Sequence, residues 1–268
     1  MTTSAHHPLL TAIASGKGGT GKTFIAATLA QALANEGERV LLFDGDIGLS
    51  NIAVQLGVPH TDRFAAVLAG TLPAHEAAVP LCKRANKLGS VDMLAGPAGS
   101  GGLNAINAAT VMRTVAALRL SIGYDRVILD LAAGIDDTVM RFAAASDECY
   151  VVLTPDPAAL TDAYAFIKLY IRRAGGRLPG FLVNQAANAR EAAQVAAALT
   201  GSCQSFLNVA PHDTGFVRRD AKVQDAVRHQ APLLKRHPQS TAAGDIIQLA
   251  RQMRRLDAAQ SARAASLR

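Results

Sequence analysis

The stretch Ser15-Gly16-Lys17-Gly18-Gly19-Thr20-Gly21-Lys22-Thr23 decides the fold of this chain. It fits the pattern Gly-x-x-x-x-Gly-Lys-Thr, whose glycines allow backbone N–H groups to curl around phosphate oxygens. In this pattern Lys22 reaches the outer phosphates and the Thr23 hydroxyl binds Mg²⁺. The apolar run Leu9–Ser15 predicts a buried strand before it, and Lys22–Asn35 predicts a helix after it, whose N-terminus attracts anions. A nucleoside triphosphate site is therefore predicted, with an ordinary glycine turn as the alternative.

Length and composition predict one α/β domain. The chain has 268 residues, of which 50% are apolar, enough for one well-buried domain of this class and short for two. We expect a short N-terminal tail over residues 1–8, a single nucleotide-binding domain over residues 9–257 and a C-terminal tail over residues 258–268.

The cysteines and the N-terminus predict a cytoplasmic protein. Cys82, Cys149 and Cys203 lie far apart, which argues against a disulfide framework and against a zinc or iron–sulfur site. Met1 to Pro8 has no basic patch followed by an apolar run, and the chain has no run of about 18 apolar residues. Lys and Arg outnumber Asp and Glu by 27 to 21, and this net charge of +6 permits attraction to acidic lipid or nucleic acid without requiring it.

Short apolar runs rich in Val, Ile and Leu alternate with longer Ala-rich stretches of helical periodicity. This alternation predicts an α/β fold with a mostly parallel, seven-stranded twisted sheet and helices on both faces, the three-layer P-loop NTPase fold. The predicted strands are Leu9–Ser15, Val40–Phe43, Val91–Ala95, Arg126–Leu131, Cys149–Leu153, Phe181–Asn184 and Ser205–Val209. The predicted helices are Phe24–Asn35, Ala105–Leu118, Leu160–Arg173, Glu191–Leu199 and Ala242–Leu256. The glycine-rich segment Gly96–Gly102 predicts either a loop near the active site or a plain connection.

Acidic residues follow two of the predicted strands. Asp44 and Asp46 come directly after the second strand, and Asp130 lies at the end of the run Val127-Ile128-Leu129-Asp130. Ligands of an open parallel sheet bind beyond the carboxyl ends of its strands, and Mg²⁺ prefers hard oxygen ligands. Asp130 is therefore the candidate Walker B carboxylate. A single Asp after a strand is more often a helix cap or turn residue, but three at one edge favour a metal site.

Lys17 is one lysine more than the phosphate pattern needs. It lies too near the start of the loop to duplicate Lys22, so it is either a solvated loop residue or a cation that acts in trans on the phosphates of a partner subunit. The run Lys-Gly-Gly-x-Gly-Lys-Thr resembles the signature of the deviant Walker A ATPases, the MinD/ParA family. The resemblance implies Mg²⁺-dependent ATP hydrolysis with slow, regulatory turnover, and a homodimer that sandwiches two nucleotides in the ATP state.

The resemblance also implies roles for individual residues. Asp46 matches the switch I aspartate that orients the attacking water, and Leu131 to Gly134 match the switch II segment that senses the γ-phosphate. Asn184 matches an asparagine that reads adenine, and Pro211-His212-Asp213 match a loop that flanks the purine. The expected catalytic residues are Lys17, Lys22 and Asp46, the expected Mg²⁺ ligands are Thr23, Asp44 and Asp130, and the expected contacts to ATP or ADP are Gly16, Lys17, Gly18, Gly19, Thr20, Gly21, Lys22, Thr23, Gly134, Asn184, Pro211 and Asp213.

Two segments indicate a branch of the family. Asp44 to Ile52 looks like the MinD side rather than the DNA-segregating ParA side. Asp130–Ile135, followed by Thr154–Pro157 and Leu160–Tyr164, is similar to the flagellar number regulators known as FlhG, FleN or YlxH. That resemblance implies a switch that controls flagellar number, placement or assembly, with an FlhF-like GTPase, a switch-complex protein or a transcription activator as partner.

Two other functions stay open. A DNA-partitioning ATPase would use the basic clusters Arg172, Arg173 and Arg177 or Arg218, Arg219 and Lys222, although such clusters are more often solvated. A MinD-like division-site regulator would bind the membrane peripherally through the apolar stripe Ile246, Leu249, Ala250, Met253 and Leu256. The alternative for that stripe is the last helix of the core.

Overall fold

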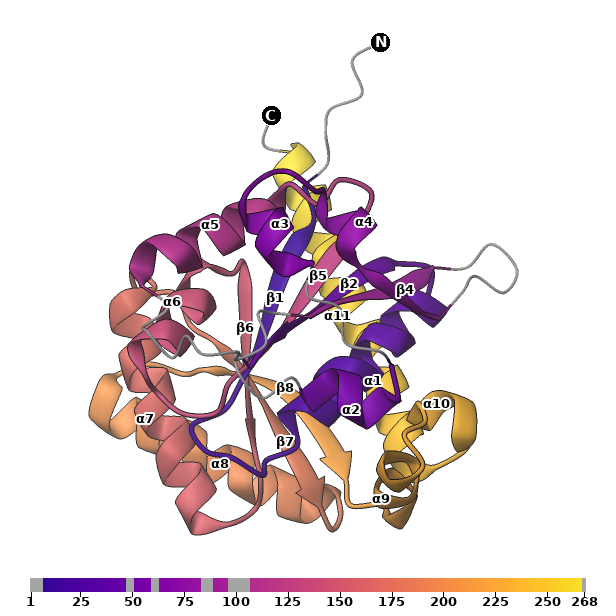
Figure 1. Cartoon of the computed structure of the whole chain (residues 1–268). Coiled ribbons are helices and arrows are strands. Elements are labelled where there is room, and N and C mark those ends of the chain that lie inside the picture. Colours follow the sequence, from indigo (N-terminus) through magenta and orange to yellow (C-terminus); the bar gives the residue numbers. More distant parts are fainter. Residues whose placement is uncertain (1–6, 47–50, 59–62, 83–88, 96–106, 267–268) are drawn as a thin grey trace.

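The computed structural model describes residues 7–46, 51–58, 63–82, 89–95 and 107–266, without the side chains of residues 51, 82 and 260–266. The predicted glycine-rich loop Gly96–Gly102 lies outside these residues. In the described part of the chain, one eight-stranded sheet lies between two layers of helices (Figure 1). The predicted three-layer α/β fold is confirmed, with one strand more than expected.

The strand order is β3-β4-β2-β5-β1-β6-β7-β8, and only β3 runs antiparallel to its neighbour. The central strands form because their Val, Ile and Leu runs are buried on both faces; every residue of β5 is buried. The strands are β1 Leu9–Ala14, β2 Arg39–Gly45, β3 Val79–Cys82, β4 Ser90–Ala95, β5 Arg126–Leu131, β6 Glu148–Leu153, β7 Gly180–Ala186 and β8 His212–Arg218.

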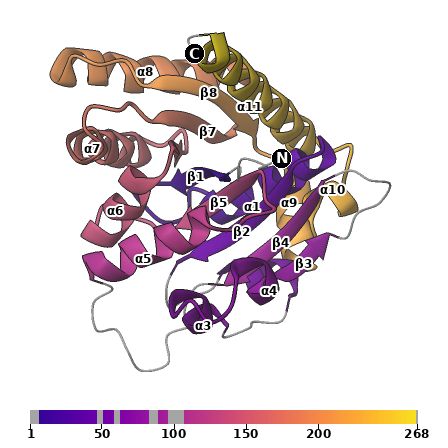
Figure 2. The same ribbon diagram turned by 90° about the horizontal axis from the view of Figure 1, so that it is seen from above.

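Each face of the sheet has its own apolar core. Helices α3 to α8 cover one face, and α1, α2, α9, α10 and α11 cover the other (Figure 2). Asn and Asp side chains cap several of the helices, for example Asp136 at α6 and Asn188 at α8. The helices are α1 Lys22–Asn35, α2 Asn51–Leu56, α3 Phe64–Leu68, α4 Ala74–Ala77, α5 Ala108–Arg119, α6 Asp137–Ala145, α7 Pro157–Arg173, α8 Ala189–Leu207, α9 Ala221–Arg228, α10 Leu233–Arg236 and α11 Thr241–Ser266.

Two differences from the predicted strands lie at the edges of the sheet. The predicted strand Ser205–Val209 is wrong, because α8 continues to Leu207 and ends at Asn208, which is left-handed with φ 56°. The last strand is instead His212–Arg218, which is only partly buried at its edge and so lacks an apolar run. Strand β3 was not predicted either; it is a short edge strand, a position that tolerates its Pro80.

Helix α11 belongs to the core. Ile246, Leu249, Ala250 and Met253 are buried against α1 and β8, whereas Leu256 is 39% exposed. The apolar stripe therefore packs inside the protein, as expected if this helix is the last helix of the core and not a membrane-binding helix. The helix continues to Ser266, through most of the segment predicted as a tail. None of the described helices combines the length and the apolar character needed to span a membrane.

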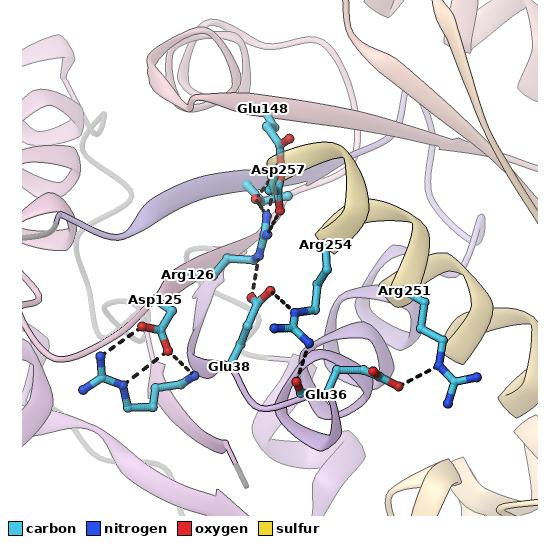
Figure 3. Close-up of polar contacts among 10 residues, drawn as sticks. Glu36, Glu38, Asp125, Arg126, Glu148, Arg251, Arg254 and Asp257 are labelled. Atoms are coloured by element: carbon cyan, nitrogen blue, oxygen red, sulfur yellow. Dashed lines mark hydrogen bonds and ion pairs between the residues drawn. The ribbon is translucent and has the colours of Figure 1, made fainter. Parts of the chain in front are cut away.

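Charged side chains tie α11 to the amino ends of the strands (Figure 3). Arg126, the first residue of β5, is almost fully buried and forms ion pairs with Glu38 at 3.0 Å, Glu148 at 3.1 Å and Asp257 of α11. Its guanidinium also donates to the Thr11 hydroxyl at 2.8 Å. This cluster anchors the later part of α11 at the amino ends of the strands, which lie opposite the phosphate loop.

Candidate nucleotide-binding site

The loop of residues 15–21 joins the carboxyl end of β1, at the centre of the sheet, to the start of α1. Two of its glycines allow close approach. A Cβ at Gly16 would lie 2.3 Å from the carbonyl oxygen of Asp162 in α7, and one at Gly21 would lie 2.4 Å from the Asn184 amide nitrogen. Gly21 also precedes α1 without a side-chain cap, so the first N–H groups of the helix stay available to an anion.

Two carboxylates lie beside this loop on neighbouring strands. Asp44 of β2 and Asp130 of β5 are paired in register, and both are 1% exposed. Neither oxygen of the Asp130 carboxylate accepts a hydrogen bond of standard geometry from the described residues, although the Thr23 hydroxyl lies nearby. Burial raises the pKa of Asp130 to about 7; Thr23 and the Lys22 ammonium act against that rise.

Asp44 holds the segment that follows β2. Its carboxylate accepts hydrogen bonds from the N–H groups of Asp46 and Ile52, each at 3.2 Å. It therefore shapes both the turn that carries Asp46 and the start of α2. The next part of the predicted switch I motif, residues 47–50, lies outside the described residues.

These oxygen groups fit Mg²⁺. A buried carboxylate that accepts no hydrogen bond of standard geometry is costly unless a ligand compensates it, and Asp130 is in this state beside Thr23 and Asp44. Among the described residues, no three His, Cys, Asp or Glu side chains converge into a closed metal cage. Mg²⁺ does not need such a cage, because it keeps several waters and binds phosphate oxygens.

Lys17 is partly exposed and forms an ion pair with Asp156. Its ammonium donates to the Asp156 carboxylate at 3.0 Å, and the two side chains are 37% and 44% exposed. Asp156 also caps α7, accepting from the Ala159 N–H at 2.9 Å. Hydrogen bonds from Thr154, from Ala159 and from Lys17 lower the pKa of Asp156 to about 2. The pair lies at an open hollow of about 440 Å³ beside the loop.

Gly134, the predicted γ-phosphate sensor, contacts the loop directly. Its N–H donates to the Ser15 carbonyl at 2.9 Å. Asn184 contacts the loop as well: it is 3% exposed and donates its amide to the Thr20 carbonyl at 2.8 Å. The structure thus brings both predicted residues to the loop.

The predicted contacts of Pro211 and Asp213 with the nucleotide base need a correction. Pro211 and Asp213 lie at the amino end of β8, which pairs with the amino end of β7. They are therefore at the end of the strands opposite the phosphate loop. Their predicted contact with the purine is wrong because the strand was placed too early. The residues that do adjoin Asn184 lie at the other end of β8. Arg218, which ends the strand, and the following Arg219 and Asp220 line a cavity of about 120 Å³ with Phe24 and Gln185. Correct placement of β8 would have identified them.

Asp220 and Arg218 connect this cavity to α11. Asp220 caps α9 through the Lys222 N–H and also accepts from the Ala242 N–H at 3.2 Å. The Arg218 guanidinium and N–H both bind Asp245. Helix α11 therefore holds the walls of this cavity, and its later turns are anchored at the opposite end of the strands.

Similarity to known proteins agrees with this geometry. Residues 11–233 match the family described as CobQ/CobB/MinD/ParA nucleotide binding domain. The chain is 33% identical over 243 residues to the antiactivator FleN of Pseudomonas aeruginosa, covering 90% of this chain and 84% of FleN. It is 38% identical over 159 residues to the flagellum site-determining protein YlxH of Helicobacter pylori, covering 59% of this chain and 52% of YlxH.

Solved structures show the same fold. The septum site-determining protein MinD of Pyrococcus horikoshii, complexed with Mg-ADP, has a TM-score of 0.74 at 24% identity and covers 93% of this chain and 97% of its own. The MinC:MinD cell division complex of Aquifex aeolicus gives a TM-score of 0.70 at 27% identity, with 91% of this chain and 95% of that chain covered.

Proposed function

The chain belongs to the CobQ/CobB/MinD/ParA family and is a P-loop ATPase, and from this premise we propose that it is an ATP-switched homodimer that regulates flagellar number or placement. The similarity to FleN and YlxH supports the flagellar role. One observation carries the dimer switch: Lys17 lies at a surface hollow beside the phosphate loop, where a second subunit can be reached.

The residues of one chain supply most of the proposed chemistry. The N–H groups of the loop and of α1 hold the phosphates, and the buried Lys22 neutralises their charge. Thr23, Asp44 and Asp130 would hold Mg²⁺, which neutralises phosphate charge when bound. Asp46, positioned by Asp44, orients the attacking water.

Lys17 supplies the contribution of the second chain. In the single chain it pairs with Asp156, and in the proposed dimer it leaves Asp156 for the triphosphate of the partner. Breaking the Lys17–Asp156 pair costs little free energy, because an ion pair this exposed contributes about 0–1 kcal/mol. Nucleotide occupancy thereby decides whether two copies associate.

We take ATP and ADP as the nucleotides. The 120 Å³ cavity beside Asn184 lies next to the loop, as a base site must, and an amide can both donate to and accept from the edge of adenine. Asn184 already donates to the Thr20 carbonyl, so base contacts would use its oxygen or a rearranged amide. Arg219 and Gln185 adjoin the same cavity and complete its polar edge.

The basic clusters give less support to DNA partitioning. Arg218 is paired with Asp245 and Arg173 with Asp137, and Arg177 donates to the carbonyl of Ser146. These three arginines already have partners within the chain. Peripheral membrane binding through the stripe of α11 also loses support, because that stripe is buried. We therefore place the protein in the cytoplasm with flagellar regulators as partners: an FlhF-like GTPase, a switch-complex protein or a transcription activator.

Light scattering coupled to gel filtration tests the switch. Wild-type protein is expected to dimerise with ATP and not with ADP. Lys22→Ala should bind no nucleotide, whereas Asp46→Ala should bind ATP, fail to hydrolyse it and accumulate as dimers. Monomers of Asp46→Ala at saturating ATP would overturn the proposal. Capture of partners with ATP-loaded Asp46→Ala then tests the flagellar role: basal-body or FlhF-like proteins are expected, and chromosomal DNA or division proteins would refute it.

A further inference from the structure

Helices α6 and α7 lie on the face of the sheet opposite α11 (Figures 1 and 2). Side chains of these two helices and of the residue Ile135 before α6 line a groove. Its volume is about 430 Å³, and it is lined by Ile135, Asp137, Met140, Leu169, Arg172 and Arg173. Ile135 is 44% exposed, an unusual exposure for a large apolar side chain. The groove thus offers apolar surface to a ligand large enough to fill it.

The rim of this groove is positively charged. Arg141 and Arg173 both bind Asp137, so the two cations share one carboxylate. Arg172 is exposed, and within the described part of the chain it has no ion-pair partner. Among the residues that line the groove, Arg172 and Arg173 accompany the single carboxylate of Asp137, which leaves a net charge of +1 around an apolar floor. Such a surface is complementary to a segment that has apolar residues on one side and carboxylates on the other.

One wall of the groove is joined to the nucleotide site. Ile135 directly follows Gly134, whose N–H donates to the Ser15 carbonyl of the phosphate loop. Asp136, the next residue, caps α6 through the Val139 N–H at 3.0 Å. Any movement of the Gly134 N–H toward a phosphate therefore shifts Ile135 and the start of α6. The other wall, α7, touches the loop where Asp162 approaches Gly16.

We propose that the α6–α7 groove docks an acidic, amphipathic segment of a partner protein, and that the nucleotide bound at the loop sets its affinity. The groove inference rests on the proposed function only for its dependence on nucleotide; the docking itself follows from the shape and charge of the groove. Ile135 and Leu169 provide the apolar contact, and Arg172 pairs with a carboxylate of the segment.

Fluorescence anisotropy with a short labelled peptide tests the docking. The peptide carries leucines on one helical face and glutamates on the other, and its counterpart has lysines in place of the glutamates. The glutamate peptide is expected to bind wild-type protein in a salt-sensitive manner, and the lysine peptide is not. Arg172→Glu should weaken binding by roughly tenfold or more, since it replaces attraction by repulsion at the rim. Its basal ATPase rate should not change.

A matched control is Arg255→Glu, which makes the same charge change at an exposed position of α11. It should bind the glutamate peptide as wild type does. Equal losses in both variants, or equal binding of both peptides, would overturn the proposal. Ile135→Ser should also lose the peptide, and retention of full affinity there would refute the apolar contact.

The two proposals fail in different ways. If Asp46→Ala stays monomeric while wild type still binds the glutamate peptide through Arg172, the dimer switch is wrong and the groove stands without nucleotide control. If dimers form normally and no peptide binds, the groove is wrong. If Arg172→Glu abolishes ATP-dependent dimerisation, the groove belongs to the interface between two copies, and the partner segment is refuted.

Discussion

The two ends of strand β5 each bury an ionisable side chain, in opposite surroundings. At the amino end, Arg126 has three carboxylate partners and the Thr11 hydroxyl (Figure 3). At the carboxyl end, Asp130 accepts no hydrogen bond of standard geometry from the described residues. A buried charge that the chain satisfies holds the fold, whereas one that the chain leaves unsatisfied calls for a ligand. Within one strand of six residues, Arg126 is satisfied by the chain itself, whereas Asp130 is the group that we propose binds Mg²⁺.

Removal of Arg126 should have the largest effect. Arg126→Ala leaves Glu38, Glu148 and Asp257 facing one another without their cation, and the loss of one partner of a buried ion pair costs about 3–5 kcal/mol. Urea unfolding at neutral pH measures this loss. The control is Arg254→Ala, because Arg254 pairs with the same Glu38 but is 42% exposed, and it should cost about 1 kcal/mol or less. Equal costs would show that burial does not distinguish the two arginines.

Ionisation of Asp130 should destabilise the folded chain, whereas the charge of Arg126 stabilises it. Its folded pKa of about 7 lies above the ordinary value of 3.8, so between these pH values the folded chain keeps a proton that the unfolded chain releases. The free energy of unfolding without Mg²⁺ or nucleotide should therefore fall as pH rises through this window, by at most about 1.4 kcal/mol per pH unit. Asp130→Asn has no such proton, and its profile should be flatter.

Urea unfolding of both proteins across that pH range measures the difference, because groups remote from Asp130 contribute equally to both profiles. Asp130→Asn should also be inactive in ATP hydrolysis while remaining at least as stable as wild type near pH 7. Parallel pH profiles for the two proteins would show that Asp130 is ionised in the folded chain, and its burial would then not support the proposed Mg²⁺ site.

The two ends of β5 also differ in how far the sequence predicts them. Asp130 was found because a local rule places ligands at the carboxyl ends of parallel strands, next to a phosphate motif of contiguous residues. Arg126 was missed because its partners Glu38, Glu148 and Asp257 come from distant parts of the chain, and no local pattern joins them. The base cavity was misplaced for a related reason: β8 is an edge strand without an apolar run. Tertiary contacts, and not local propensity, place these residues.

The smallest effect is expected at the Lys17–Asp156 ion pair, whose charges are partly exposed and paired with each other. Lys17 and Asp156 are both partly exposed, so their pairing lies between the two cases at β5. Asp156→Asn keeps an N-cap for α7, because Asn caps as well as Asp does, but it removes the charge that holds Lys17 within its own chain. If Lys17 acts in trans, the variant should dimerise at a lower protein concentration in ATP. The gain is limited to about 1 kcal/mol, or roughly fivefold, by the weakness of exposed ion pairs.

Sedimentation velocity across a range of protein concentrations measures this shift, with Asp213→Asn as the control at the opposite edge of the sheet. The variant should gain nothing in ADP, where no γ-phosphate attracts a lysine from the second chain. Weaker dimerisation in ATP would mean that Asp156 supports the associated state and does not compete with it. In that case the Lys17–Asp156 pair would resemble Arg126, whose contacts stabilise the structure, more than Asp130, for which we propose a metal ligand.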